Sequence, residues 1–348
     1  MKLLVTGASG FLGNYVVAEA LKRGHQVRAV VRPSTNEQNL ALHNHPALEL
    51  IRIDLLQQDG IVNALQGVEA VIHLAAAKDG DFDTRFAGTV TATQNLLNAM
   101  TEASVLRLIA ISTFSVYDYL RSPSGATITE ETSLERCPLD RDVYAQTKLL
   151  QEGLIRGFEQ NYTAQVTIVR PGLVYGKDRL WNTLLGGKLT DRLWLRIGAS
   201  ATLPLTYVEN CADAILSATE REEAIGQTIN IIDDNLPTRR TYVQKLAKLK
   251  YSMPRTIPVN WTLMRSIALI VWIYNKKVLK GQVKLPGLFN PAILDARFKH
   301  FCFSNTRAKQ ILNWKPAYSL DTALDRSCSD VEMSQVPQLT PTLKSLKN

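Results

Sequence analysis

Short apolar runs alternate with longer amphipathic stretches along the first half of the chain. The run at residues 3–5 leads into a glycine-rich turn, and residues 11–22 then carry apolar side chains at helical spacing. The runs with the length and composition of buried strands are 3–5, 26–31, 48–53, 70–74, 106–111 and 166–170. Strands that alternate with amphipathic helices predict an α/β fold with a Rossmann-type, doubly wound parallel sheet. Ligands of such sheets bind beyond the carboxyl ends of the strands.

The first turn carries glycines at three-residue intervals, in a GxxGxxG pattern rather than the more familiar GxGxxG. A turn without Cβ atoms lets backbone amides approach a pyrophosphate, and the N-terminus of the following helix adds partial positive charge. Its position between the first strand and the first helix favours dinucleotide binding over a simple tight turn. The residues predicted to contact the dinucleotide here are Gly7, Ser9, Gly10, Phe11, Leu12 and Gly13.

The end of the second predicted strand carries an arginine where an NAD-preferring site usually carries an acid. Arg32 lies 19 residues after Gly13, and the first acid beyond it is Glu37. A guanidinium can pair with a 2′-phosphate, so NADP(H) is the preferred cofactor, with NAD(H) possible, unless Arg32 is only a solvated strand end. Asp54, after the third strand, is a candidate acceptor for the adenine amino group or, alternatively, a helix N-cap.

Tyr144 and Lys148 are four residues apart and therefore share one face of a helix. An ammonium close to a phenol is expected to lower the phenol's pKa, so that the tyrosine can act as acid for ketone reduction and as base for alcohol oxidation. The lysine can also hold the nicotinamide ribose. A YxxxK pair occurs by chance in many helices, but a buried strand upstream delivers the hydroxyls of Ser112, Thr113 and Ser115 at its carboxyl end. A hydroxyl there can orient the reacting oxygen.

Six short motifs stand in a fixed order along the chain. They are TGASGFLG at residues 6–13, Asp54-Leu55, HLAA at 73–76, STFSVY at 112–117, YAQTK at 144–148 and RPGLVYG at 170–176. This order resembles that of the extended short-chain dehydrogenases/reductases, the superfamily of NAD(P)-dependent epimerases and dehydratases. The likeness covers about residues 1–235, and LNWKP at 312–316 is similar to that family's C-terminal signature. Within the superfamily the chain most resembles the 3β-hydroxysteroid dehydrogenase-like branch.

The resemblance implies roles for individual residues. It makes Thr113, Tyr144 and Lys148 the catalytic set, and it makes His73 structural rather than part of a proton relay. No residue is expected to bind a metal. In addition to the glycine turn, Arg32 and Asp54, it implies cofactor contacts at Leu55, Leu74, Ala75, Ala76, Tyr144, Lys148, Pro171, Gly172 and Val174.

Three further segments bear on the reaction and the substrate. Sugar-nucleotide dehydratases of the family carry an acid directly after the catalytic threonine, whereas Phe114 follows Thr113 here, which argues against dehydration. LTYVENCADA at residues 205–214 is similar to the YVENVAxA segment of the hydroxysteroid and sterol-carboxylate dehydrogenases, which favours a lipophilic substrate. Thr89 takes the place of the family's usual asparagine, while Asn95 is retained.

The net charge of +8 is concentrated in one region. Residues 239–299 contain 13 Lys or Arg and a single acid, Asp295, which gives +12 for that stretch and leaves the remainder slightly acidic. This distribution indicates a local anionic partner. Nucleic acid is not expected, because the basic residues are interleaved with apolar stretches and no recognised binding motif occurs.

Cysteine spacing and the N-terminus indicate where the protein works. The four cysteines lie far apart, without CxxC or metal-ligand spacing, which predicts a reduced protein. The first apolar run leads straight into the glycine turn and leaves no room for a secretory signal. We therefore expect a cytoplasmic protein, in contact with the inner face of a membrane if the next segment binds lipid.

The segment WTLMRSIALIVWIY at residues 261–274 ends in eight consecutive apolar residues, and Lys276, Lys277, Lys280 and Lys284 follow it. It is shorter than the roughly 20 apolar residues that cross a bilayer. Three interpretations remain open: an ordinary core helix, the lining of a lipophilic pocket, or peripheral membrane contact through residues 257–284, held by anionic lipid. A homodimer is the other possible macromolecular partner.

The chain is expected to divide into three parts. Residues 1–175 form the NAD(P)-binding Rossmann domain with the catalytic residues, and residues 176–324 form a smaller, mainly helical substrate lobe interleaved with the last Rossmann elements. Residues 325–348 are polar and form a mobile tail.

The leading functional hypothesis is an NAD(P)-dependent oxidoreductase. It would transfer a hydride between nicotinamide and a secondary alcohol or ketone on a lipophilic small molecule, such as a sterol-like or β-keto lipid. A nucleotide-sugar epimerase or reductase is the alternative among enzymes, and a non-catalytic NADPH-binding regulator is the alternative outside them. The intact Thr–Tyr–Lys set favours an enzyme.

Overall fold

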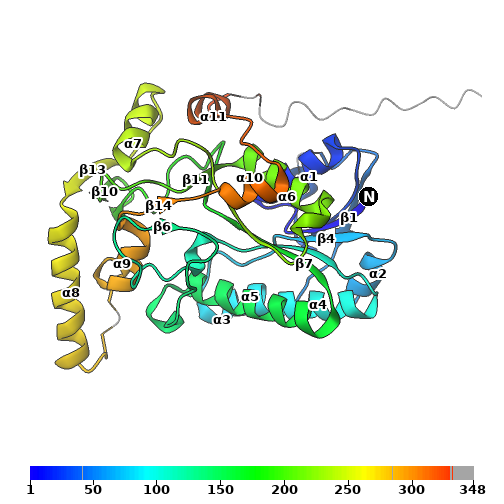
Figure 1. Ribbon diagram of the computed structural model, residues 1–348, viewed down its shortest axis with the longest axis horizontal. Coiled ribbons are helices and arrows are strands. Elements are labelled where there is room, and N and C mark those ends of the chain that lie inside the picture. The colour runs from blue at the N-terminus through cyan, green and yellow to red at the C-terminus, as the bar shows by residue number, and fades with distance from the viewer. Residues whose placement is uncertain (41, 284, 330, 332–348) are drawn as a thin grey trace, which may run out of the picture.

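A seven-stranded parallel sheet forms the centre of the molecule (Figure 1). The computed structural model describes residues 1–40, 42–283, 285–329 and 331. The sheet strands are β1 (Lys2–Thr6), β2 (Gln26–Val31), β3 (Leu48–Arg52), β4 (Ala70–His73), β5 (Arg107–Ile111), β7 (Gln165–Pro171) and β12 (Thr228–Ile231). They lie in the order β12-β7-β5-β4-β1-β2-β3, and every neighbouring pair is parallel. The predicted fold class is confirmed, and the predicted strand runs match the strands to within one residue at either end.

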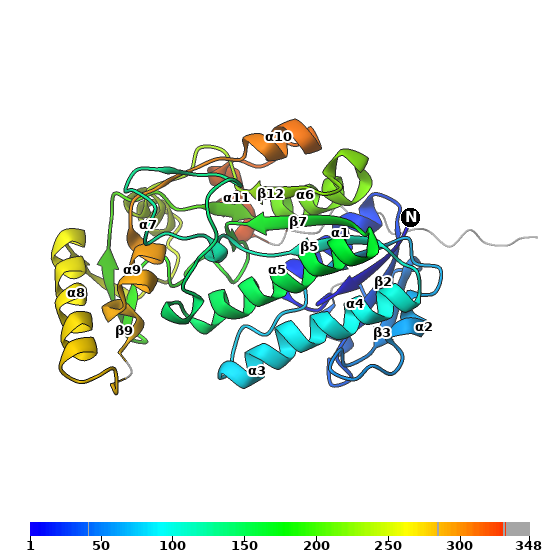
Figure 2. The ribbon, with the colours of Figure 1, turned by 60° about the horizontal axis from the view of Figure 1, so that its bottom comes forward.

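Helices cover both faces of this sheet (Figures 1 and 2). On one face α1 packs against α6, and on the other α4 packs against α2 and α5. A short helix and one turn of π-helix lead into α4. The helices of the two layers are α1 (Phe11–Lys22), α6 (Val208–Glu220), α2 (Ile61–Leu65), α3 (Phe82–Phe86), the π turn (Ala87–Thr91), α4 (Ala92–Glu102) and α5 (Val143–Tyr162).

Each face of the sheet has its own apolar core. Alternate residues of β1 point to opposite faces, so Leu3 and Val5 join one cluster and Leu4 joins the other. The first cluster includes Val16 of α1, and the second includes Met100 of α4. These buried layers hold the sheet rigid and position its carboxyl edge.

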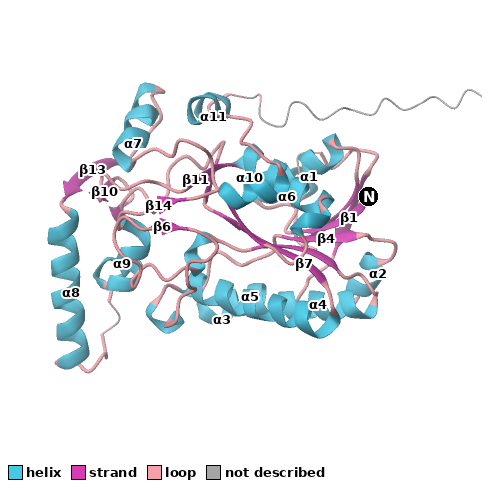
Figure 3. Ribbon diagram, in the orientation of Figure 1, coloured by secondary structure: helices cyan, strands magenta, loops and turns pink. Residues whose placement is uncertain are grey.

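The second half of the chain adds a lobe beyond the sheet, which Figure 3 shows as mixed helix and strand. Its strands are β8 (Leu173–Tyr175) paired with β11 (Leu205–Tyr207), β14 (Cys302–Phe303) paired with β6 (Thr127–Ile128), and a three-stranded sheet of β9 (Gly187–Thr190), β10 (Leu193–Ile197) and β13 (Arg255–Val259). Its helices are α7 (Arg239–Lys248), α8 (Trp261–Lys277), α9 (Pro291–Phe298), α10 (Thr306–Leu312) and α11 (Leu320–Ser327). The described residues contain no helix that is both long enough and apolar enough to cross a membrane.

Two details differ from the sequence-based expectations. The lobe, expected to be mainly helical, also contains the β9-β10-β13 sheet, whose strands are short and lack a clear alternation of buried and exposed residues. The mobile tail was expected to begin at residue 325, but Arg326 and Ser327 belong to α11, where the side chain of Ser327 is buried. Residues 330 and 332–348 of that tail lie outside the described residues. The predicted boundary at residue 175 stays a prediction.

Candidate active site

All the predicted cofactor-binding segments meet at the carboxyl edge of the large sheet. Because the strands are parallel, the residues that follow them lie along one side. The glycine turn follows β1, Arg32 follows β2 and Asp54 follows β3. The segments after the other strands are Leu74–Ala76 after β4, Thr113 after β5, and Gly172 with Val174 after β7. Tyr144 and Lys148 reach this edge from α5, which packs beside it.

Close packing explains the glycines of the first turn. Gly7 has a φ of +69°, and a Cβ there would lie 2.9 Å from the amide nitrogen of Ala75. A Cβ on Gly13 would lie 2.1 Å from the carbonyl oxygen of Gly7. Helix α1 begins directly after Gly10, has no side-chain cap and has no acid in its first turn. Its free first-turn amides and its dipole therefore suit a pyrophosphate, and the turn fits a bound dinucleotide.

The edge near β2 and β3 carries two guanidinium groups. Arg32 is exposed directly after β2. Arg52, which the sequence analysis did not single out, donates to the carbonyl oxygen of Thr35 (2.8 Å) and forms an ion pair with Glu37 (2.7 Å). Glu37, the first acid after the glycine turn, is thus already paired with a cation. A phosphate on the ribose would therefore not be repelled here, as it would be by an unpaired carboxylate.

The loop after β3 is fixed by local hydrogen bonds. The Asp54 carboxylate accepts a hydrogen bond from the amide of Leu56 (3.0 Å), and α2 begins only at Ile61. The alternative interpretation of Asp54 as a helix N-cap is therefore wrong, because this residue caps a turn. The side-chain amide of Asn95 donates to the carbonyl oxygen of Leu55 (2.9 Å) and anchors the loop to α4.

Thr89, which takes the place of the family's usual asparagine, holds the loop after β4. The hydroxyl of Thr89 accepts a hydrogen bond from the amide of Ala77 (3.0 Å), directly after the HLAA segment. Thr89 is buried in the π turn before α4. A threonine at this position therefore ties the loop to the helical layer, and the substitution leaves no unpaired group there.

After β7 the backbone passes too close to its neighbours for a side chain. A Cβ on Gly172 would lie 2.2 Å from the carbonyl oxygen of Pro204. The amide of Gly172 donates to Ile231 (2.9 Å) and that of Leu173 donates to Pro204 (2.6 Å). Pro171 is buried, while Val174 is partly exposed on the same edge. These contacts position Pro171, Gly172 and Val174 beside the end of β5, where Thr113 lies.

Thr113 and Tyr144 meet across the gap between β5 and α5. Thr113 caps the short 3-10 helix η3 (Phe114–Val116) by accepting a hydrogen bond from the amide of Ser115 (3.2 Å). Helix α5 begins after Asp142, whose carboxylate accepts from the amide of Ala145 (3.1 Å), so Tyr144 lies in the first turn. The hydroxyls of Thr113 and Tyr144 lie close enough for a hydrogen bond between them to lower the pKa of Tyr144.

The pKa of Tyr144 differs from the sequence-based expectation. Burial raises this pKa above its usual range, the hydrogen bond with Thr113 opposes the rise, and the charge of Asp142 adds to it. The expected lowering by Lys148 is therefore wrong for this arrangement. Desolvation outweighs the attraction of a cation whose ammonium is directed elsewhere. Tyr144 is accordingly a protonated phenol at neutral pH.

Lys148 is buried, and its ammonium donates to the carbonyl oxygen of Ile111 (2.6 Å) and to the side-chain oxygen of Gln151. The first contact attaches α5 to the carboxyl end of β5. Burial lowers the pKa of Lys148 to about 8, with the charge of Glu152 opposing the shift and that of Lys78 adding to it. Two of the three ammonium hydrogens are used by the protein, and one remains for a ligand.

A buried chain of hydrogen bonds connects Lys148 to the glycine turn. Gln151 donates to the hydroxyl of Thr93 (2.8 Å), and that hydroxyl itself donates to a carbonyl oxygen. Nε2 of His73 lies 2.8 Å from the hydroxyl of Thr93 and 3.2 Å from the side-chain nitrogen of Gln151, and its Nδ1 lies 2.7 Å from the hydroxyl of Thr6. The Thr6 hydroxyl in turn accepts from the amide of Ala75 (3.3 Å). All these groups are paired when His73 is neutral.

The titration of His73 agrees with this assignment. Burial, with the charge of Lys148, lowers the pKa of His73 to about 3. The imidazole is therefore neutral at physiological pH and acts as a fixed donor and acceptor. These contacts agree with the structural role expected for His73.

A buried ion pair supports the base of α5. Glu152 accepts two hydrogen bonds from Arg170, at 2.9 and 2.6 Å, and a third from the hydroxyl of Ser112. Burial works to raise the pKa of Glu152, but the contacts with Arg170 and Ser112 lower it overall. Arg170 also donates to the hydroxyl of Tyr117 (3.1 Å). Ser112 is thus occupied within the core, which leaves Thr113 as the hydroxyl nearest Tyr144.

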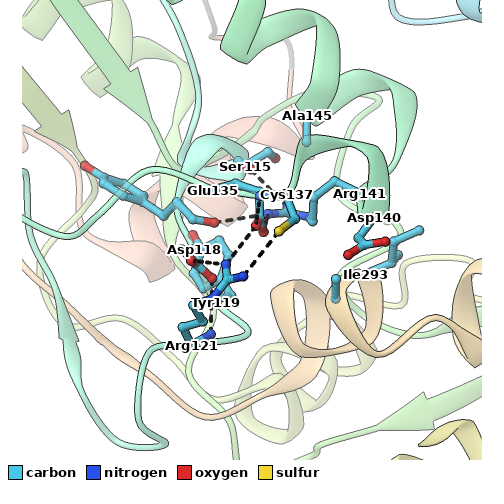
Figure 4. Close-up of polar contacts among 12 residues, drawn as sticks. Ser115, Asp118, Tyr119, Arg121, Glu135, Cys137, Asp140, Arg141, Ala145 and Ile293 are labelled. Carbon is cyan, nitrogen blue, oxygen red and sulfur yellow. Dashed lines mark hydrogen bonds and ion pairs between the residues drawn. The ribbon is translucent and has the colours of Figure 1, made fainter. Parts of the chain in front are cut away.

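A second buried pair clamps the start of α5, as Figure 4 shows. Arg141 donates to the carbonyl oxygens of Ser115 (2.9 Å) and Tyr117 (3.0 Å) and forms an ion pair with Glu135 (3.3 Å). Both charged side chains are almost fully buried. Arg141 lies three residues before Tyr144, so this clamp joins the loop that carries Thr113 to the turn that carries Tyr144.

The sequence analysis missed several of these residues. Glu152 follows Lys148 by four residues, so its place on the same helical face was readable, but its partner Arg170 was not. No sequence pattern pointed to Gln151, Arg141 or Lys78, because each of them acts through partners that only the fold brings near.

The YVEN-like segment has a role in the fold. Glu209 forms an ion pair with Arg326 of α11 (2.7 Å), and Asn210 exchanges hydrogen bonds with the backbone of Tyr318. These contacts attach the C-terminal helix to α6. The likeness to the hydroxysteroid dehydrogenases in this segment therefore concerns an anchor of the fold, and it does not describe a substrate contact.

Comparisons with known proteins agree with this architecture. The model of the "NAD dependent epimerase/dehydratase family" matches residues 3–231. A sterol-4-alpha-carboxylate 3-dehydrogenase (decarboxylating) of Bos taurus is 26% identical over 338 residues, with 93% of this chain and 90% of the relative covered. An uncharacterized UDP-glucose epimerase of Bacillus subtilis is 30% identical over 250 residues, with 66% of this chain and 76% of the relative covered.

Solved structures share the fold at low identity. A UDP-glucuronic acid 4-epimerase from Bacillus cereus, solved in complex with NAD, superposes with a TM-score of 0.70 at 23% identity. The match covers 94% of this chain and 99% of the epimerase. At this identity the likeness establishes the fold.

Proposed function

Because the chain belongs to the NAD dependent epimerase/dehydratase family, whose members are NAD(P)-dependent oxidoreductases and epimerases, we propose that it is an NADP(H)-dependent oxidoreductase. Its reaction is hydride transfer between the coenzyme and a carbonyl or secondary alcohol. The observation that carries this proposal is the convergence of Thr113, Tyr144 and Lys148 on the same sheet edge as the glycine turn.

When bound, the nicotinamide coenzyme supplies or accepts the hydride. The protein's part is to bind, orient and move a proton. The first-turn amides of α1 would hold the pyrophosphate, and the remaining ammonium hydrogen of Lys148 would hold the nicotinamide ribose. Thr113 orients the substrate oxygen by a hydrogen bond, and Tyr144 exchanges a proton with that oxygen.

The pKa of Tyr144 supports reduction as the direction that runs best at neutral pH. A phenol whose pKa is raised by burial keeps its proton and can donate it to a carbonyl oxygen. Alcohol oxidation needs the phenolate, which forms only as the pH rises. We therefore expect ketone reduction to persist at neutral pH and alcohol oxidation to increase toward alkaline pH.

The coenzyme preference rests on Arg32 and its surroundings. Arg32→Asp replaces a guanidinium that can pair with a 2′-phosphate by a repelling carboxylate. A charged hydrogen bond of about 1.5–3 kcal/mol corresponds to a loss of about 10- to 150-fold in NADPH affinity. NADH, which lacks this phosphate, should bind within about threefold of the wild type by fluorescence titration. Equal losses for both coenzymes would remove the basis for the NADP(H) assignment.

The substrate we propose is a ketone or secondary alcohol on a lipophilic skeleton. The likeness to the sterol-carboxylate dehydrogenase spans nearly the whole chain and includes the lobe, whereas the likeness to the UDP-glucose epimerase covers two thirds of it. Phe114 also follows Thr113 directly and stacks on Phe303 of the lobe, at 5.8 Å between ring centroids. The proposed site of reaction thus adjoins two stacked aromatic rings.

A nucleotide-sugar reaction is the second candidate, and one feature favours it. Lys78 and Arg179 lie near enough for the charge of Arg179 to lower the pKa of Lys78, although burial lowers it more. Lys78 in turn acts on Lys148. A pair of cations beside the catalytic lysine could bind a diphosphate, but it could equally bind a carboxylate on a lipid.

One screen separates these candidates. The consumption of NADPH is followed with a panel of lipid ketones and with a panel of UDP-sugars. Turnover with lipid ketones, abolished by Tyr144→Phe, is the expected result. Interconversion of UDP-sugars without net NADPH consumption would replace the proposal with the epimerase. Tight NADPH binding with neither activity would favour the non-catalytic regulator.

A further inference from the structure

Helix α8 lies at the outer end of the lobe, far from the large sheet (Figures 1 and 2). It follows β13 and packs against α9 and the short 3-10 helix η6 (Gly287–Phe289). Its inner face carries two buried residues, Met264 and Ala268, which join a small apolar cluster with Leu294 and Phe298. The opposite face points away from the molecule.

The outer face of α8 carries a stripe of apolar residues, with the exposed Thr262 and Ser266 beside it. Leu263, Ile267, Ile270 and Tyr274 follow one another at spacings of four, three and four residues and therefore form a single stripe. Their side chains are 58%, 40%, 67% and 54% exposed. Leu269 and Ile273 extend the stripe on one side and are also exposed.

The distribution of apolar and polar residues on α8 is the reverse of that on an ordinary surface helix. A surface helix turns its apolar stripe to the core and its polar residues to water. Here the side facing the core is narrow, whereas the side facing water carries the largest aliphatic residues of the helix. An exposed apolar patch of this kind marks a binding surface. The interpretation of residues 261–274 as an ordinary core helix therefore does not fit the structure.

Cations follow the apolar stripe at its C-terminal end. Lys276, Lys277 and Lys280 are exposed at the C-terminal end of α8, and the ammonium of Lys276 lies 4.7 Å from the centre of the Trp272 ring. Lys284 lies outside the described residues. The only acid of the stretch 239–299, Asp295, is fully buried.

The burial of Asp295 removes the one negative charge that the stretch 239–299 itself could place beside these cations. Its carboxylate forms ion pairs with Arg265 (3.1 Å) and Lys299 (3.5 Å) inside the lobe. The outer surface around α8 therefore combines exposed aliphatic and aromatic groups with net positive charge. An anionic lipid surface presents the complementary properties, an apolar interior beneath negative headgroups.

We propose that α8 docks the protein on the surface of a bilayer that contains anionic lipids. The helix has 17 residues and is about 25 Å long, so it lies in the plane of the interface with its stripe among the acyl chains. The lysines that follow it contact the headgroups. This inference does not depend on the substrate or on the reaction proposed above.

A second copy of the chain is a poorer occupant of this surface. A homodimer through α8 would bring together the exposed Lys276, Lys277 and Lys280 of two copies. The like charges of the two copies would repel each other, whereas anionic headgroups would attract the lysines. We therefore treat self-association as an outcome of the test.

The test is flotation of the full-length protein with vesicles. Binding is compared between pure phosphatidylcholine and phosphatidylcholine mixed with phosphatidylglycerol, at low and at moderate salt. The wild type should float with the anionic vesicles and less with the neutral ones. Leu263→Ser combined with Ile270→Ser should abolish flotation, while circular dichroism and thermal unfolding remain those of the wild type.

Matched variants separate a local contact from general effects. Tyr162→Ser removes a similarly exposed aromatic residue from α5 and should leave flotation unchanged. Lys276→Glu with Lys277→Glu should reduce binding to anionic vesicles at least about tenfold, since each cation near the headgroups contributes about fivefold. Lys248→Glu with Lys250→Glu makes the same change in net charge away from α8 and should have a much smaller effect.

Several outcomes would overturn the proposal. One is wild-type protein that stays in the soluble fraction with anionic vesicles at low salt. Another is binding that survives the Leu263→Ser and Ile270→Ser pair. A dimer in sedimentation that dissociates in this pair, without any vesicle binding, would assign the stripe to self-association instead.

Discussion

Helices α5 and α8 distribute their polar and apolar side chains in opposite ways. Helix α5 buries Lys148, Gln151 and Glu152 and gives each of them a hydrogen-bond or ion-pair partner. Helix α8 exposes Leu263 and Ile270 and buries little. A polar group buried without a partner is unfavourable, and so is a large apolar patch exposed to water.

The difference indicates where each helix meets its partner. The polar residues of α5 are satisfied within the protein, and they hold the groups that face the proposed coenzyme. The apolar residues of α8 have no such cover among the described residues, which agrees with the lipid contact proposed for them. Buried polar groups thus indicate internal positioning, and exposed apolar groups indicate an external contact.

The largest expected effect concerns the polar end of α5. Tyr144→Phe removes the proton donor and should lower kcat about 10²- to 10⁴-fold, the usual contribution of a general acid. The affinity for NADPH should stay within about threefold of the wild type, because the contacts proposed for the glycine turn, Arg32 and Lys148 remain. Stopped-flow rates and fluorescence titration measure the two quantities.

Tyr162→Phe is the matched control, because it removes a hydroxyl from the exposed C-terminal end of the same helix. Its kcat should equal that of the wild type. A Tyr144→Phe enzyme with unchanged kcat would show that the phenol is not the acid.

The buried ion pair beneath α5 should dominate stability. Glu152→Ala leaves the guanidinium of Arg170 buried without its carboxylate, which should lower the free energy of unfolding by about 3–5 kcal/mol. Glu159→Ala, on a partly exposed part of the same helix, should change it by less than about 0.5 kcal/mol. Urea unfolding measures both. Similar losses for the two variants would mean that the pair is not a stabilising contact.

The two faces of α8 should respond differently to truncation. Met264→Ala creates a cavity on the buried face and should lower the free energy of unfolding by about 2–5 kcal/mol. Ile270→Ser, on the exposed stripe, should change it by less than about 0.5 kcal/mol in the absence of lipid. A large loss from Ile270→Ser would instead make the stripe part of the core.

The smallest effect concerns the titration of His73. Its pKa is lowered from 6.5 to about 3, so the folded state stays neutral while the unfolded chain takes up a proton below about pH 6.5. Stability is therefore present above that pH and is lost as the pH falls toward 3. One proton accounts for a slope of about 1.4 kcal/mol per pH unit.

His73→Gln removes this proton while it retains a hydrogen-bonding side chain. The variant should unfold in urea with a correspondingly shallower dependence on pH between about 6 and 4. Identical slopes for variant and wild type would contradict the buried, neutral state assigned to His73.

Local patterns made much of the fold predictable. The bounds predicted for α1 and β2 match the structure, because helical periodicity, a buried run and flanking glycines all act within a few residues. The β9-β10-β13 sheet was missed, because β13 pairs with β10 from some 60 residues away and none of the three strands shows a clear alternation. Tertiary pairing defines these strands, and their own sequence does not.

The candidate site was predictable to a similar extent. Tyr144 and Lys148 could be paired from their spacing, and the buried strand before them offered several hydroxyls, among which the family resemblance selected Thr113. The direction of the Tyr144 pKa shift could not be predicted, because it depends on burial and on where the Lys148 ammonium points. The contacts of Arg141 with the loop after β5 could not be predicted either, because its partners there are carbonyl oxygens that any residue could supply.

A crystal structure of the protein with bound NADP⁺ tests the central claim most directly. The account predicts that the pyrophosphate lies against the turn between Gly7 and Gly13, and that the nicotinamide lies beside Tyr144 and Lys148. A coenzyme bound elsewhere, or a nicotinamide beyond hydrogen-bonding reach of any substrate held by Thr113 and Tyr144, would contradict it.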